Sequence, residues 1–128
     1  MADLSITAAN VLNSGGGGVY QGTAGASITA GQTVYLDAAT STIKLADANL
    51  SSAAATVKGI ALHAASTGQP ILVQTDGVIT LGSVLTAGLI YVCSATAGAI
   101  APSADLTSGW RTSILGVALT SSTLKLNI

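Results

Sequence analysis

Apolar and polar residues alternate over short stretches of this chain, and glycines and small polar residues separate the stretches. Thr42-Ile43-Lys44-Leu45 alternates in the way expected of a strand with one buried face. Other runs are rich in the β-branched and aromatic residues that favour strands. These runs lie at 33–36, 56–62, 70–75, 78–80, 89–92, 112–119 and 123–128. Residues 46–55 are compatible with a short helical turn, and the pattern as a whole predicts an all-β fold.

The chain contains two loose copies of one segment, at residues 28–75 and 85–128. Ile28-Thr29-Ala30-Gly31 is matched by Leu85-Thr86-Ala87-Gly88, 57 residues later. Each copy, at about 45 residues, is too small to bury a core by itself. We therefore expect one merged β domain over residues 25–128, a small barrel or sandwich with internal pseudo-twofold symmetry.

Residues shared by the two copies are expected to be scaffold. Gly59 and Gly116 interrupt corresponding strands, which indicates a bulge or the close approach of another backbone. Tyr35 and Tyr91 also correspond if one residue is dropped between the copies, and both are then expected in the core. Asp76-Gly77, between two apolar runs, is a turn signal.

Residues 1–24 lie before the repeat and predict an extended N-terminal arm. Gly15–Gly18 is a run of four consecutive glycines, which has maximal backbone freedom and no side chains to pack. We interpret this run as a hinge between an apolar end and a lead-in at Val19-Tyr20.

The composition excludes several classes of partner. Only 7% of the residues are charged, against about 25% in a typical soluble domain. Such a surface is poorly protected against association, and much of it is expected to be buried against partners. The four Lys and Arg residues are scattered, which argues against nucleic acid, because phosphates are neutralised by clustered cations.

The chain is apolar enough that a membrane segment has to be considered. Val84–Ala101 carries no charge, but it contains several polar residues and glycines, and its counterpart in the first copy holds Asp37, Lys44 and Asp47. Charges of this kind are costly in a bilayer core. The N-terminus also lacks the basic region of a signal peptide. We therefore expect a soluble protein without a membrane partner.

No catalytic or metal-binding set stands out. His63 is the single histidine, and no glutamate is present to act with it. Cys93 is the single cysteine, and a lone cysteine is usually a small buried apolar residue. We expect neither a cofactor nor a metal site, and the sequence predicts a protein that is not an enzyme.

Trp110-Arg111 is the clearest difference between the copies, because the first copy has Ala53-Ala54 at that place. Trp and Arg are enriched in the energetic centres of protein interfaces. The pair is therefore a candidate interface anchor. A tryptophan that closes one end of the barrel, with the arginine in solvent, explains it equally well.

The second copy has a pattern found in a known class of virus protein. The chain resembles the capsid decoration, or cement, proteins of tailed bacteriophages. The runs that carry the resemblance are Leu85–Gly88, Ser94–Gly98, Ile100–Pro102, Ala104–Leu106, Ile114–Ala118 and Leu124–Ile128.

The resemblance implies a β-rich structural protein on the outer surface of a virion assembled in the host cytoplasm. Such proteins typically form homotrimers that bind the major capsid protein across capsomer boundaries and stabilise the capsid. They often grip the capsid with a terminal arm, which suits residues 1–24. The candidate contacts in the arm are Asp3, Leu4, Ile6, Val11 and Leu12.

Two other functions stay open at this point. A surface- or carbohydrate-binding module of a virion or cell surface would use Trp110 and the three tyrosines. Aromatic residues make up only 3% of the chain, which disfavours a stacking platform. A small hydrolase is disfavoured by the missing acid–base set.

Overall fold

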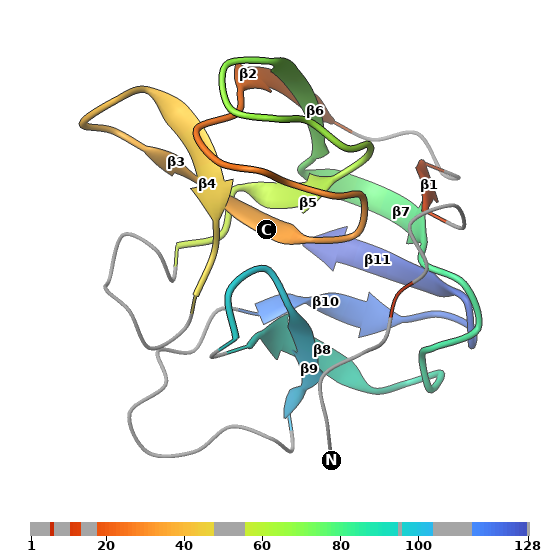
Figure 1. Ribbon diagram of the computed structural model, residues 1–128. Coiled ribbons are helices and arrows are strands. Elements are labelled where there is room, and N and C mark those ends of the chain that lie inside the picture. Colours follow the sequence, from red (N-terminus) through yellow and green to blue (C-terminus); the bar gives the residue numbers. More distant parts are fainter. Residues whose placement is uncertain are drawn as a thin grey trace.

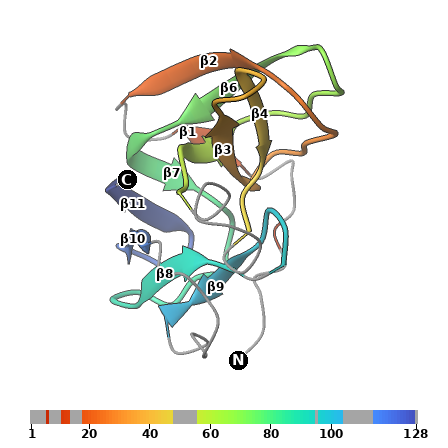
Figure 2. The ribbon, with the colours of Figure 1, turned by 90° about the vertical axis from the view of Figure 1, so that its left-hand side faces the viewer.

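The computed structural model describes residues 6, 11–13, 18–47, 56–94, 96–103 and 114–127, and these residues form two antiparallel β-sheets. Sheet A has the order β1-β7-β11-β10-β8-β9 and sheet B the order β2-β6-β5-β3-β4 (Figure 1). The all-β prediction is confirmed, and the arrangement is sandwich-like and not a closed barrel. Figure 2 shows sheet B above sheet A.

Most strands of both sheets lie near a run expected from the sequence, but β2 and β9 were not predicted as strands. Sheet B consists of β2 (Val19–Thr23), β3 (Thr33–Asp37), β4 (Thr42–Leu45), β5 (Gly59–Ala61) and β6 (Pro70–Gln74). Sheet A consists of β1 (Leu12–Asn13), β7 (Asp76–Thr80), β8 (Ile90–Cys93), β9 (Ile100–Pro102), β10 (Ile114–Ala118) and β11 (Thr123–Asn127). The helical turn expected within residues 46–55 falls mostly outside the described residues.

The five long strands of each sheet follow one another in the same spatial order. β2, β6, β5, β3 and β4 of sheet B correspond in order to β7, β11, β10, β8 and β9 of sheet A. A repeated sequence would produce this correspondence, and the repeat itself stays a prediction. The correspondence also includes β2, which lies within residues that the sequence interpretation placed in the N-terminal arm.

The strand register corrects one expected equivalence between the copies. β5 places Gly59 opposite Val34, whereas β10 places Gly116 opposite Tyr91. If the two glycines correspond, Tyr91 corresponds to Val34 and not to Tyr35. Successive side chains point to opposite faces of a strand, so a shift of one residue exchanges the two faces. Val34 and Tyr91 are both buried, while Tyr35 is half-buried against the core.

Two hydrophobic clusters form the core, and the larger one joins the two sheets. The larger one joins inward-facing residues of sheet A, such as Leu115 and Leu124, to Ile60 of sheet B. The smaller cluster lies on the other face of sheet B, where Ile28 covers Val34 and Ile71. Sheet B therefore contributes buried residues on both of its faces, as expected when an additional chain segment packs over a sheet.

The chain changes sheet between β6 and β7. Thr75 is the one residue between the two strands, and Gly77 has a φ of 82°. Asp76 and Gly77, which the sequence predicts as a turn between two strands, are instead the first two residues of β7, opposite Asn127 and Leu126, and the corner of the sandwich lies just before them at Thr75. The fully buried Gln74 holds this corner, because its Nε2 donates hydrogen bonds to the carbonyl oxygens of Asp76 (2.9 Å) and Val78 (3.0 Å).

The prediction for the two strand glycines is confirmed. A Cβ placed on Gly59 would overlap the carbonyl oxygen of Gln74, and one placed on Gly116 would overlap that of Lys125. The pairing of β10 with β8 also shifts register between Ile114 and Gly116. Both glycines therefore allow a neighbouring backbone to approach closely.

Candidate functional site

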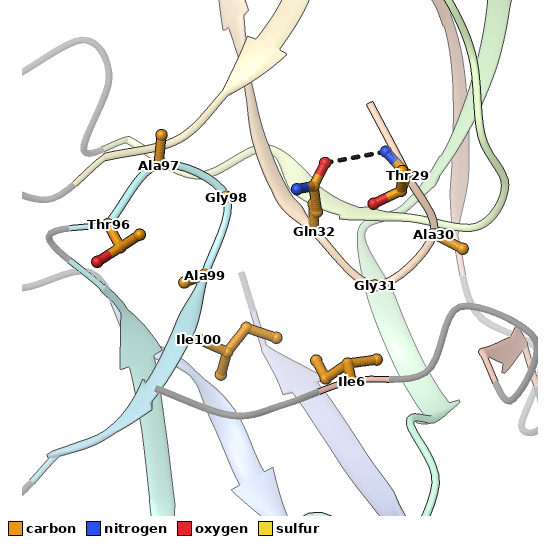
Figure 3. A pocket seen from close by; sticks show the side chains of 10 residues that line it. All are labelled: Ile6, Thr29, Ala30, Gly31, Gln32, Thr96, Ala97, Gly98, Ala99 and Ile100. Carbon is orange, nitrogen blue, oxygen red and sulfur yellow. Dashed lines mark hydrogen bonds between the residues drawn. The ribbon is translucent and has the colours of Figure 1, made fainter. Parts of the chain in front are cut away.

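Ile6 lines a groove at the side of the sandwich. One wall is the turn Thr29–Gln32, which leads into β3, and the other is the turn Thr96–Ala99 between β8 and β9. Ile6 lies beside Ile100 at the base of the groove (Figure 3). The open volume next to these side chains is about 290 Å³.

Backbone hydrogen bonds connect the two walls. The amide of Thr33 donates to the carbonyl oxygen of Gly98 (2.9 Å), and the amide of Gly98 donates to that of Ala46 (2.7 Å). Within the first turn, the amide of Thr29 donates to Oε1 of Gln32 (2.9 Å, Figure 3). Since both turns are anchored in this way, the groove is a fixed feature of the fold.

Three of the five candidate arm residues lie in the described part of the chain, and all three contact the domain. Ile6 is half-buried and packs against the larger core cluster, which includes the buried Val11. Leu12 pairs with Thr80 as the first residue of β1. Asp3 and Leu4 lie outside the described residues. The role of these five residues in gripping a capsid stays a prediction.

The candidate anchor Trp110-Arg111 also lies outside the described residues.

The structure has a second groove, which the sequence did not predict. It is apolar, has a volume of about 410 Å³ and lies on the outer face of sheet A. Ile90, Ile114, Val117 and Lys125 line it, and Ile90 and Ile114 are 43% and 54% exposed. Their apolar character alone did not distinguish them from core residues, because both kinds of residue occur in the same strands.

The three tyrosines are held within the domain. Tyr91 is buried, and its hydroxyl oxygen accepts a hydrogen bond from the amide of Thr86 (2.9 Å). Tyr20 is half-buried and packs against the smaller cluster, with Nζ of Lys58 4.7 Å from its ring centre. Tyr35 packs against the larger cluster. All three rings are thus at least partly buried in the domain.

His63 stabilises the turn between β5 and β6 through hydrogen bonds. Its Nε2 accepts a hydrogen bond from the amide of Leu72 (3.1 Å), and its Nδ1 lies 2.9 Å from the carbonyl oxygen of Ala64. Thr120, its counterpart in the second copy, accepts a hydrogen bond from the amide of Thr123 (3.1 Å) with its hydroxyl. Different side chains thus support the corresponding turns of the two sheets.

The described residues contain no cluster of three or more His, Cys, Asp or Glu side chains placed to hold a metal ion.

An ion pair between Asp37 and Lys44 (2.7 Å) joins β3 to β4. The hydrogen bond from Lys44 lowers the pKa of Asp37, and the same bond raises the pKa of Lys44. In the part of the chain that the structure describes, no helix has the length and apolar character needed to cross a membrane.

Cys93 is fully buried, as the sequence predicts, and burial raises the pKa of its thiol from 9.0 to about 11. The folded protein therefore resists ionisation of a thiol that ionises readily in the unfolded chain. The free energy of unfolding that depends on this thiol is therefore at its full value below about pH 9, and it decreases as the pH rises toward 11. At pH 10 the loss is about 1.4 kcal/mol, because one pKa unit corresponds to that free energy.

Urea unfolding at pH 8 and pH 10 tests this linkage. The wild-type protein is expected to lose about 1.4 kcal/mol more than a Cys93→Ala variant between the two pH values. Tyrosine and lysine ionisation affects both proteins alike and cancels in the comparison. An equal pH dependence of the two proteins would show that the thiol ionises freely in the folded state.

Comparison with known proteins gives no further assignment: no protein-family model matches the chain, and no curated protein does.

Proposed function

We propose that this chain is a non-enzymatic structural protein of a tailed-phage virion, a homotrimer that binds the outside of the capsid across capsomer boundaries and stabilises it. The resemblance of residues 28–128 to phage decoration proteins suggests this role. The structural observation that supports it is the apolar outer face of sheet A.

This face has the properties of a contact surface. Ile90 and Ile114 flank the groove of about 410 Å³, and among the described residues of its lining Lys125 alone is charged. Leu89 and Leu119 are also exposed and lie next to β8 and β10 in the chain. Contiguous exposed apolar side chains of this kind mark sites of protein association.

Repeated binding sites on a capsid lattice would make individually weak contacts sufficient for stable attachment. The groove is shallow, and one copy would gain limited affinity from a few aliphatic side chains. A trimer on a capsid binds through several equivalent contacts, and the effective concentration of the second and third contacts strengthens attachment without any new interaction. The sparse charge of the chain leaves little electrostatic repulsion between neighbours.

Lysine substitution on this face tests the proposal. Ile114→Lys is expected to weaken co-sedimentation with empty capsids at least about tenfold, because a charge is then placed in an apolar contact. Val19→Lys is the matched control. Val19 is 46% exposed, but it lies on β2 of sheet B. Both variants should fold normally, since neither position is buried.

Light scattering of the purified protein is expected to give the mass of a trimer. The wild-type protein and Val19→Lys should saturate empty capsids at a fixed ratio to the major capsid protein. If wild-type protein stays in the supernatant at every concentration, the capsid function is wrong. If Ile114→Lys binds as well as Val19→Lys, the capsid contact lies elsewhere.

A further inference from the structure

Lys125 differs from the other lysines in the described part of the chain, because its charge has no partner there. Nζ of Lys44 lies 2.7 Å from a carboxylate oxygen of Asp37. Nζ of Lys58 lies 4.7 Å from the centre of the Tyr20 ring, which is a cation–π contact. Lys125 is exposed, and no ion pair or ring contact joins its ammonium group to another described residue. Water therefore solvates this charge in the isolated protein.

Lys125 lies within the apolar groove on the outer face of sheet A. The strand register places it directly opposite Val117 on β10 and Val78 on β7. Val117 is in turn opposite Ile90 on β8. Directly opposite residues of antiparallel strands point to the same face of a sheet, so the four side chains form one row across the outer face. The one charge of this row thus lies between aliphatic side chains.

A protein that covers this row has to satisfy the ammonium group. Docking removes water from the groove, and an ammonium group that loses its water without gaining a partner is strongly unfavourable. A carboxylate placed against it restores the lost interaction through a charge-assisted hydrogen bond. Apolar side chains beside that carboxylate would cover Ile90 and Ile114. The charge and the apolar surface together therefore define the chemistry of the occupant.

A second copy of this chain meets this requirement poorly. The described residues include three aspartates, and all three have contacts within their own molecule. Asp37 forms the ion pair that joins β3 to β4. Asp76 accepts a hydrogen bond from the amide of Gly18, and Asp47 also interacts within the molecule. Since pairing with a neighbour's lysine would compete with these contacts, the occupant is expected to be a different protein.

We propose that the groove on sheet A receives a segment of the capsid protein in which a carboxylate lies between apolar side chains, and that this carboxylate pairs with Lys125. The proposal rests on the capsid function proposed above. The aliphatic part of Lys125 packs between Val78 and Val117, and its ammonium group meets the carboxylate. Lys125 then fixes where the segment lies, while Ile90 and Ile114 supply apolar contact area.

Replacement of the charge tests the pairing. Lys125→Met keeps the length of the side chain and removes the charge, so co-sedimentation with empty capsids should become at least about tenfold weaker. Lys125→Arg keeps the charge and should bind about as tightly as the wild type. Gln21→Glu, at an exposed position of β2 in sheet B, changes the net charge by the same amount as Lys125→Met and should also bind like the wild type. Both positions are exposed, so all three variants are expected to fold.

Chemical crosslinking identifies the carboxylate. A carbodiimide joins a lysine amine to a carboxyl group that is in contact with it. Wild-type protein on capsids should therefore yield a crosslinked peptide that contains Lys125 and an aspartate or glutamate of the capsid protein, which mass spectrometry of the digest detects. Lys125→Arg, which keeps the charge but has no amine at this position, is the control and should lack this product.

The outcomes separate the pairing from the capsid function. If the wild type binds capsids and Lys125→Met binds equally or more tightly, the pairing is wrong and the capsid function stands, because apolar side chains alone then cover the row. Equal weakening by Lys125→Met and Gln21→Glu also overturns the pairing, since net charge then accounts for the effect. A crosslink from Lys125 to a second copy overturns it as well. Failure of the wild type to bind capsids removes the proposed function, and this partner with it.

Discussion

Gly116→Ala is expected to destabilise the protein by about 3 kcal/mol, because overpacking of this kind forces backbone to move. The methyl group would overlap the carbonyl oxygen of Lys125 in the neighbouring strand β11. Backbone cannot rotate out of the way as the end of a side chain can. Relief therefore requires β10 to separate from β11 in the middle of sheet A. Thermal and urea unfolding measure the effect.

Gly68→Ala is the matched control for this substitution. Gly68 has a φ of 89°, and a Cβ there would meet no atom of the described residues within 4 Å. It should cost about 1–2 kcal/mol, the usual cost of a left-handed conformation for an L-residue. If Gly116→Ala costs no more than Gly68→Ala, the two strands are farther apart than the structure has them.

Gln74→Glu is expected to cost about 3 kcal/mol or more at pH 7, because a buried carboxylate without a partner is strongly unfavourable. The amide nitrogen that now donates to the carbonyl oxygens of Asp76 and Val78 would be replaced by a negatively charged oxygen. Three acceptors would then face one another at the corner between the sheets. Within the described part of the chain, Oε1 of Gln74 already has no hydrogen-bond partner.

The pH dependence of this variant has a definite sign. Burial should raise the pKa of the introduced carboxyl group above its unfolded value of about 4.3. The part of the penalty that comes from ionisation is therefore absent below about pH 4 and grows as the pH rises, and the protonated carboxyl group still donates one hydrogen bond in place of two. Gln74→Met, which cannot ionise, should cost about 1–3 kcal/mol at every pH for the carbonyl groups left without a donor. Equal stability of the two variants at pH 7 would mean that water reaches the corner.

Sequence reasoning located most strands because their signals are local. The alternation in residues 42–45 and the β-branched runs at 33–36 and 123–128 lead directly to β4, β3 and β11. The run at 56–62 was less exact, since only Gly59–Ala61 pair as β5. Residues beside a strand carry the same propensities as residues within it, so pairing alone decides where the strand ends.

The candidate site was predictable only in part. The sequence indicated that the apolar residues Ile6 and Val11 pack against another surface. No local signal shows that both side chains lie against Gly31 of the same chain. The tyrosine register was wrong for a similar reason. Likeness between Val34-Tyr35-Leu36 and Ile90-Tyr91-Val92 suggested one alignment, while the strand partners Gly59 and Gly116 impose another.

The sequence by itself determined the class of structure, the strand runs and the places where glycine is required, because these follow from side-chain alternation and from steric limits on each residue. The tertiary structure alone decided the strand order, the crossing from sheet B to sheet A at Gln74 and the seating of Ile6. It also decided that Ile114 is exposed while its neighbour Leu115 is buried. These features depend on contacts between residues far apart in the chain, and such contacts leave no local pattern.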